Sequence, residues 1–387
     1  MNRRRAASAA VLLALLLPLP LAGAGTSAAA DAPSAAESRR TTLELPRPTG
    51  RFSVGQETLH LVDRSRTDPW SRSGPRELMV TMRYPAQRGT GGPVRYLTRE
   101  EARLLLVDRG LDKVIPAETL AGTTAYSRSH ARPVAGRYPL IVLSPGFTVP
   151  RATLTALAED LASRGYVVAA VDHAYESAGT AFPGGRVLEC LACEKVEAAG
   201  GMHLVSDTRA RDVSFLLDRL TGRDPAWRHA GLIDASRIAM AGHSIGGASA
   251  AAAMATDPRV RAGVNMDGGL ATPVPETGLG GRPFMLLGAQ GRGPGGNPSW
   301  DRDWPKLDGW KRWITFADSG HFTFSDFPVF GDQLGLPDAE APLSGTRSVE
   351  LTRRYVAAFF DQHLGGVPQP VLDGPSADAP EVRFHTP

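Results

Sequence analysis

A serine flanked by glycines is the strongest sign of chemistry in the sequence. The pentapeptide 242–246, Gly-His-Ser-Ile-Gly, has the pattern G-x-S-x-G, which is typical of a nucleophilic serine on a sharp turn between a strand and a helix. An apolar run, 237–241, precedes it, and an Ala-rich stretch that ends at Met254 follows it. Side chains larger than glycine would collide with neighbouring backbone in such a turn. The pattern predicts Ser244 as a nucleophile; the alternative is an ordinary Gly-rich turn.

A serine hydroxyl needs a base to become a good nucleophile, and His321 is the best placed of the nine histidines. It follows an expected strand, 313–316, and precedes an expected helix, 348–364. His243 lies within the turn itself, so we do not expect it to act as the base. The sequence predicts His321 as the general base and acid; the alternative is a histidine of a surface loop.

A carboxylate should orient this histidine and stabilise its charged form. The expected strand 283–287 runs into residues 288–291, which contain no carboxylate. Asp267 comes directly after another expected strand, 262–266, and would therefore lie at the same edge of a parallel sheet as the serine. We expect Asp267 to be the orienting acid. The remaining candidates are Asp301, Asp303 and Asp318.

Acyl transfer also needs two N–H groups that stabilise a negative carbonyl oxygen. One is expected from the main chain of Ile245, the residue after the nucleophile. The other should come from the segment that follows the expected strand 140–144, where Gly146 permits a turn. We expect the main-chain N–H of Phe147 to be this second donor; the alternative is that Gly146 only ends a strand.

The elements that must position these groups alternate between strands and helices. Apolar runs predict strands at 140–144, 166–171, 237–241, 262–266, 283–287 and 313–316, and helical periodicity predicts helices at 151–164, 204–220 and 348–364. This alternation indicates a parallel sheet with helices on both faces. Two earlier runs, 56–63 and 77–84, predict antiparallel strands at one edge, and residues 175–202 are expected to form a long loop. No internal repeat is found, so one domain over 51–365 is expected.

The N-terminus has the features of an export signal. Three arginines precede the apolar run 11–17, and Ala28–Ala30 offer a small-residue cleavage site. A membrane span needs about 20 apolar residues, which this run lacks. Residues 1–30 are therefore expected to be a cleaved signal peptide of a secreted protein. Residues 31–50 are expected to form a flexible lead-in, and residues 366–387 a Pro-rich C-terminal tail.

Charge and cysteine content limit the partners. The formal net charge is +3, and residues 1–30 hold three arginines and no acid, so the cleaved chain would be close to neutral. Nothing in this balance favours nucleic acid as a partner. The two cysteines, Cys190 and Cys193, could close a small disulfide loop outside the cell. A metal site would need two further ligands, so neither a metal nor a cofactor is expected.

Five stretches in a fixed order make the sequence similar to a known family. They are 143–147 (LSPGF), 161–173 (LASRGYVVAAVDH), 242–247 (GHSIGG), 266–267 (MD) and 320–321 (GH). With these stretches the chain resembles the plasma-type platelet-activating-factor acetylhydrolases and their bacterial secreted lipase relatives, over roughly residues 50–365. The family places its acid on the earlier strand, where Asp267 stands. One departure is Pro145-Gly146, where the animal members have His-Gly; the main-chain donor at Phe147 survives that change.

The resemblance implies an α/β-hydrolase fold, with a mostly parallel central sheet, antiparallel edge strands and helices on both faces. It also implies hydrolysis of short-chain acyl or lipid esters through an acyl-enzyme on Ser244. Alternatives are a secreted lipase, a cutinase-like polyester hydrolase, a peptidase and a non-catalytic binding protein. The expected partner is a small-molecule or lipid ester, with transient contact to a lipid surface and a monomeric chain.

Several aromatic side chains follow the expected strands near the site. Trp300, Phe322 and Phe324 could line a substrate pocket. The alternative for at least half of such aromatic residues is packing in the core.

Overall fold

The computed structural model describes residues 42–386, in which eleven strands form one sheet. Their order is β13-β12-β11-β10-β9-β5-β6-β2-β1-β4-β3. The longer strands are β1 (Ser53–Thr67), β2 (Pro75–Ala86), β5 (Tyr138–Ser144), β6 (Val167–His173), β9 (Ile233–His243), β10 (Val260–Met266), β11 (Phe284–Gly288) and β12 (Lys311–Phe316). The short ones are β3 (Gly92–Pro93), β4 (Ser127–Ser129) and β13 (Val382–His385), and β7 (Thr180–Ala181) pairs with β8 (Val187–Leu188) in a separate hairpin.

The centre of the sheet is parallel and its flanks contain antiparallel pairs. Neighbours from β6 through β5, β9, β10 and β11 to β12 pair in parallel. Strand β2 pairs antiparallel with β6 and with β1, and β13 pairs antiparallel with β12. The predicted mostly parallel sheet with antiparallel edge strands is confirmed. Strand β13 lies within the segment 366–387 that was expected to be a tail, so the sheet extends beyond residue 365.

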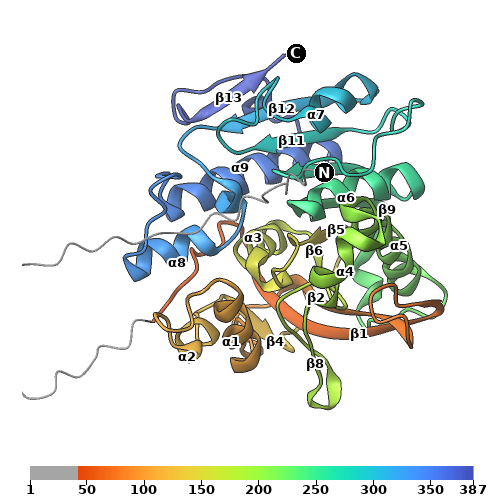
Figure 1. Ribbon diagram of the computed structural model, residues 1–387, viewed down its shortest axis with the longest axis vertical. Coiled ribbons are helices and arrows are strands. Elements are labelled where there is room, and N and C mark those ends of the chain that lie inside the picture. The colour runs from red at the N-terminus through yellow and green to blue at the C-terminus, as the bar shows by residue number, and fades with distance from the viewer. Residues whose placement is uncertain (1–41, 387) are drawn as a thin grey trace, which may run out of the picture. The chain divides into compact units, whose positions relative to one another are not determined.

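Helices cover both faces of the sheet, as Figure 1 shows. They are α1 (Arg99–Asp108), α2 (Ala117–Ala121), α3 (Thr155–Arg164), α4 (Leu191–Ala199), α5 (Gly201–Thr221), α6 (Ile245–Thr256), α7 (Pro298–Asp303), α8 (Phe327–Leu334) and α9 (Gly345–His363). Helices α5 and α6 pack on one face, and α3 and α9 pack on the other. Because the central strands are buried on both faces, their sequences are continuously apolar rather than alternating.

The segment 175–202 is more ordered than a long loop. It contains the hairpin β7–β8 and helix α4. Ala192 and Val196, one turn apart on α4, are buried against the domain. The prediction was wrong here because two buried positions are too few to show helical periodicity in a stretch rich in Gly and charge.

Part of the predicted flexible lead-in is packed against the domain. Leu43 and Leu45 are fully buried, and their main chains pair with Thr124. Their burial against α1 and α8 could not be seen in an Ala-, Ser- and Pro-rich composition. The predictions for residues 1–30 and 31–41 lie outside the described residues.

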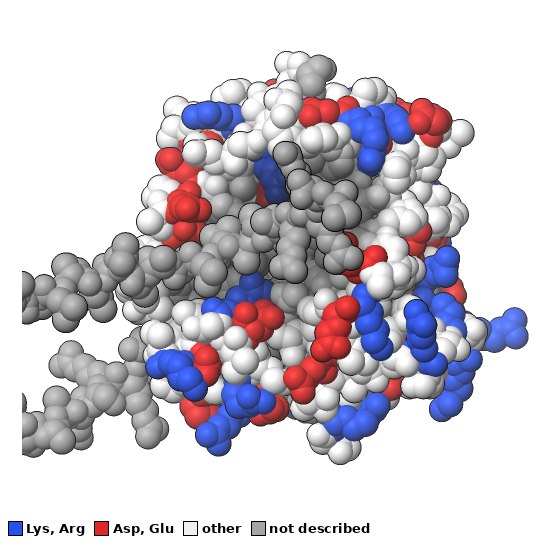
Figure 2. All heavy atoms as spheres, in the orientation of Figure 1, with Lys and Arg blue, Asp and Glu red and all other residues white. Residues whose placement is uncertain are grey.

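Two further properties concern membranes and charge. No helix within 42–386 is both long enough and apolar enough to cross a bilayer. On the face seen in Figure 2, basic and acidic side chains are interspersed among the described residues.

The packing of α9 predicts a large loss of stability when its core face is truncated. Phe359 is fully buried and its ring packs against Trp310 and Phe360. We expect Phe359→Ala to lower the free energy of unfolding by about 3–5 kcal/mol, measured by chemical denaturation. Val367→Ala is the control, because Val367 is 54% exposed and its truncation should change the free energy by less than about 0.5 kcal/mol. Equal losses in both variants would contradict this assignment of the core.

Candidate active site

Ser244 lies at the turn between β9 and α6, in a conformation that few residues adopt. Its φ is 56° and its ψ is −128°, outside the ordinary allowed regions. The Ser244 N–H donates to the carbonyl oxygen of Met266 at 2.8 Å. The turn is therefore tied to the end of β10, the next strand in the sheet.

Glycines allow three backbone segments to meet at this turn. A methyl group on Gly242 would lie 2.2 Å from the carbonyl carbon of Gly246. One on Gly246 would lie 2.0 Å from the carbonyl oxygen of Ser144, at the end of β5. One on Gly268 would lie 1.9 Å from the carbonyl oxygen of Ser244. The ends of β5, β9 and β10 can approach this closely only without side chains at these positions.

The predicted Ser244, His321 and Asp267 are brought into one hydrogen-bonded chain. The Nδ1–H of His321 donates to Oδ2 of Asp267 at 2.6 Å, and Nε2 of His321 lies 3.0 Å from the Ser244 hydroxyl oxygen. Because Nδ1 carries the proton, Nε2 is free to accept from the hydroxyl. Two of the three rival carboxylates are engaged elsewhere: Asp301 accepts from the Gly295 N–H, and Asp303 pairs with Arg302.

Asp267 is buried, and both of its carboxylate oxygens have nearby donors. Its carboxylate is only 1% exposed. The second oxygen, Oδ1, accepts from the Ala289 N–H at 2.8 Å, and Nε of Arg292 lies 3.4 Å away. The end of β11 thus supplies the donor that sets the rotamer of an acid carried by β10.

His243 positions the loop of His321, a role that the sequence did not indicate. Its Nε2–H donates to the main-chain carbonyl of His321 at 2.7 Å. Burial, followed by the neighbouring imidazole of His321, lowers the pKa of His243 to about 3. His243 is therefore neutral at ordinary pH and acts as a fixed donor to the loop. The motif G-x-S-x-G leaves this position unspecified, so only the contact identifies it.

The two predicted main-chain donors belong to segments that meet at the serine. Ile245 begins α6, and Phe147 lies in the segment 145–148 that follows β5. Within residues 42–386, neither N–H donates to another protein group. Both remain free to bind an oxygen.

Two of the three predicted pocket aromatics belong to the core instead. Trp300 and Phe324 are 0% and 1% exposed. The Trp300 indole packs on Trp313 and donates to the carbonyl oxygen of Gly268 at 2.6 Å, so it supports the loop of Asp267. Phe324 packs on Phe316. Trp300, on helix α7, and Phe324, in the turn at 321–324, therefore point into the core and not into a substrate pocket.

Phe322 lies beside the site, and the Arg109 guanidinium packs over its ring. The sequence did not predict this contact. Its ring centroid is 5.3 Å from that of His321. The Arg109 guanidinium lies 5.0 Å from the Phe322 centroid and donates to the Thr148 hydroxyl. Arg109 follows α1, and no motif connects it to Ser244.

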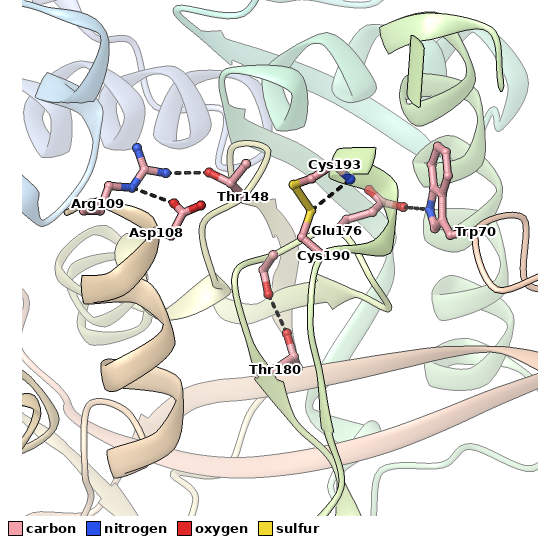
Figure 3. Close-up of a disulfide and its surroundings, with 9 residues drawn as sticks. Trp70, Asp108, Arg109, Thr148, Glu176, Thr180, Cys190 and Cys193 are labelled. Carbon is pink, nitrogen blue, oxygen red and sulfur yellow. Dashed lines mark hydrogen bonds and ion pairs between the residues drawn. A yellow bond between two sulfur atoms is a disulfide. The ribbon is translucent and has the colours of Figure 1, made fainter. Parts of the chain in front are cut away.

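A disulfide joins Cys190 to Cys193 at the start of α4. Figure 3 shows it between Thr148 on one side and Glu176 and Trp70 on the other. Cys190, Tyr175 and Phe147 each pack against the apolar cluster that contains the buried Ile245. The loop and its helix therefore form one wall beside the nucleophile.

Comparison with known proteins identifies related esterases. A model of the family described as platelet-activating factor acetylhydrolase, isoform II, matches residues 102–185 and 226–365. A probable 1-alkyl-2-acetylglycerophosphocholine esterase of Arthroderma benhamiae is 30% identical, and the match covers 91% of this chain and 96% of that protein. The platelet-activating factor acetylhydrolase of Canis lupus familiaris is 24% identical, over 86% of this chain and 79% of that one.

One solved structure matches this chain over nearly the whole length of the solved protein. The ferulic acid esterase of Streptomyces cinnamoneus is 45% identical, with a TM-score of 0.79, and the match covers 89% of this chain and 99% of that one. The predicted α/β-hydrolase fold and the predicted family resemblance are confirmed. The chain is a carboxylic ester hydrolase of the α/β-hydrolase fold and belongs to the platelet-activating factor acetylhydrolase isoform II family.

Proposed function

We propose that the chain hydrolyses short-chain acyl or lipid esters through Ser244, His321 and Asp267. One observation carries the proposal: the His321 imidazole is bonded to a buried carboxylate on one side and lies 3.0 Å from the serine hydroxyl on the other. This arrangement can remove the hydroxyl proton as the serine attacks, and it requires no metal or cofactor.

The reaction proceeds in two acyl-transfer steps. Ser244 Oγ attacks the ester carbonyl carbon while Nε2 of His321 takes the hydroxyl proton. The carbonyl oxygen becomes negative and binds the N–H groups of Phe147 and Ile245. His321 then gives its proton to the leaving alcohol, which leaves an acyl-enzyme. A water molecule, deprotonated by His321, attacks the acyl carbon, and Ser244 leaves with the returned proton.

A second candidate substrate is an ester of an aromatic acid. The structural neighbour at 45% identity is named a ferulic acid esterase, and its identity to this chain exceeds the 30% of the fungal relative. The aromatic side chains of Phe147 and Tyr175 both pack against the apolar cluster that contains Ile245, and such flat surfaces suit an aromatic acyl group.

We also propose that the enzyme is exported. The basic and apolar residues within 1–30 have the pattern of a cleaved signal peptide. The Cys190–Cys193 disulfide suits an oxidising compartment. We propose as well that the enzyme is monomeric and that it contacts lipid surfaces only transiently.

Active-site labelling tests the proposal directly. A fluorophosphonate probe should add one adduct to the wild-type chain, because the activated Ser244 hydroxyl attacks phosphorus. Ser244→Ala should gain no mass and lose ester turnover. Intact mass spectrometry measures the adduct and also locates the N-terminus of the exported chain. Persistent ester turnover by Ser244→Ala would contradict the proposed mechanism.

The orienting role of Asp267 predicts a severe loss of turnover in an isosteric variant. In Asp267→Asn the amide no longer favours a proton on Nδ1, so Nε2 is no longer kept free to accept. We expect kcat to fall by about 10⁴, measured with p-nitrophenyl acetate. Asp301→Asn, a matched change in α7, should keep kcat within about twofold. Near-normal kcat in Asp267→Asn would show that another group orients His321.

A substrate panel separates the candidate acyl groups. We expect kcat/KM to fall as p-nitrophenyl esters lengthen from acetyl to dodecanoyl, because the proposed substrate carries a short acyl chain. A 2-acetyl ether phospholipid and methyl ferulate should be compared under the same conditions. Preference for methyl ferulate would favour the aromatic ester, and preference for long chains would favour a lipase and contradict the short-chain proposal.

A further inference from the structure

A network of buried charged and polar side chains lies beneath the segment 145–148, separate from Ser244, His321 and Asp267. We call it the polar network; its members are Arg76, Ser144, His173, Glu176, Arg209 and Asp212. None of them is more than 2% exposed. Burying several charges costs free energy that apolar side chains of similar size would not. This cost raises the question of what the network holds in place.

Members of the polar network form hydrogen bonds with the segment 145–148 at both of its ends. On one side, Nη1 of Arg209 donates to the carbonyl oxygen of Pro145 at 2.5 Å. On the other side, the N–H of Thr148 donates to the main-chain carbonyl of Glu176 at 3.0 Å. Only Gly146 and Phe147 lie between these anchors, and Phe147 carries the N–H that the proposed mechanism uses.

Both anchors converge on Glu176. The Nε–H of Arg209 donates to Oε2 of Glu176 at 2.7 Å. The side chain of Glu176 therefore binds Arg209, which donates to Pro145, while the main-chain carbonyl of Glu176 accepts directly from Thr148. A single residue thus connects the peptide groups on either side of Phe147.

Glu176 is itself immobilised by two further donors. The Trp70 indole N–H donates to Oε1 at 2.9 Å, as Figure 3 shows, and Nη2 of Arg76 donates to the same oxygen at 2.6 Å. Burial alone would raise the pKa of Glu176, but the charges of Arg209 and Arg76 outweigh it and lower this pKa. The carboxylate therefore stays charged and fully bonded.

A buried Ser-His-Asp chain supports the end of β5. The Ser144 hydroxyl lies 3.1 Å from Nε2 of His173, and the Nδ1–H of His173 donates to Asp212 at 2.8 Å. Arg209 donates to the same hydroxyl at 3.2 Å. Because Ser144 is fully buried, this chain cannot reach a substrate. It fixes the residue just before Pro145.

We propose that Arg209 and Glu176 are positioning residues that hold the Phe147 N–H in place for the negative oxygen of the reacting ester. The inference rests on the proposed function. Donors of this kind act only when their geometry is set before the reaction, and a misplacement of about 1 Å is enough to slow it about 100-fold. Arg209 lies between the two stretches that match the family model.

A pair of matched arginine variants tests the inference. Arg353 is also buried, and it donates to the main-chain carbonyls of Ala156 and Pro46; among the described residues it makes no hydrogen bond to segment 145–148. We expect Arg209→Lys to lower kcat for p-nitrophenyl acetate by about 10- to 100-fold, with KM changed by less than about threefold. Arg353→Lys should keep kcat within about threefold at a comparable loss of Tm.

A role in stability alone would give equal kcat in the two variants, or a change in KM only, and either result would overturn the inference. If Arg209→Lys does not fold, Glu176→Gln replaces it, because this change keeps the main-chain acceptor and removes the charge that orients Arg209. A folded Glu176→Gln variant with wild-type kcat would also overturn the inference.

Labelling and turnover of the wild type keep the two proposals apart. If wild-type turnover does not depend on Ser244, the proposed function fails. If it does depend on Ser244 but Arg209→Lys and Glu176→Gln turn over normally, only the positioning role fails. The rate of fluorophosphonate labelling should fall in parallel with kcat, since the phosphoryl oxygen binds the same two donors.

Discussion

The hydrogen bond from His321 to Asp267 depends on the whole sheet. Asp267 ends β10, and His321 follows β12, so the bond forms only because β11 separates them at a fixed spacing. Strand β11 also supplies the Ala289 N–H that holds the second carboxylate oxygen. A shift in the pairing of these three strands would move the acid away from the imidazole. The imidazole could then no longer present a free nitrogen to Ser244.

Close backbone contacts place the serine against the strands that serve it. Gly246 touches the end of β5, and Gly268 touches the carbonyl of Ser244. The nucleophile, the acid and the segment that carries Phe147 therefore share one rigid junction. Rigidity here suits a reaction in which charge develops on one oxygen, because donors that need no rearrangement stabilise that charge best. The polar network likewise holds the Phe147 N–H in place, from a position further from the substrate.

The relatives of this chain are named for different substrates. The family model is named for platelet-activating factor and the fungal relative for 1-alkyl-2-acetylglycerophosphocholine, whereas the structural neighbour is named for ferulic acid. A common fold cannot distinguish these esters. Substrate choice must come from side chains around the junction, including the wall of α4 and its disulfide, which lies outside the stretches matched by the family model.

The sequence by itself predicted the parallel sheet and the turn at Ser244 from local patterns, and it predicted the partners His321 and Asp267 from chain order and, for Asp267, from the family resemblance. Short-range periodicity could not show which side chains face inward where distant segments meet. Trp300 and Phe324 turned into the core, Leu43 and Leu45 docked against α1 and α8, and α4 formed within an expected loop. The roles of His243, Glu176 and Arg209 likewise required the tertiary structure. Their partners lie on other elements, and a hydrogen bond between such elements exists only once the chain has folded.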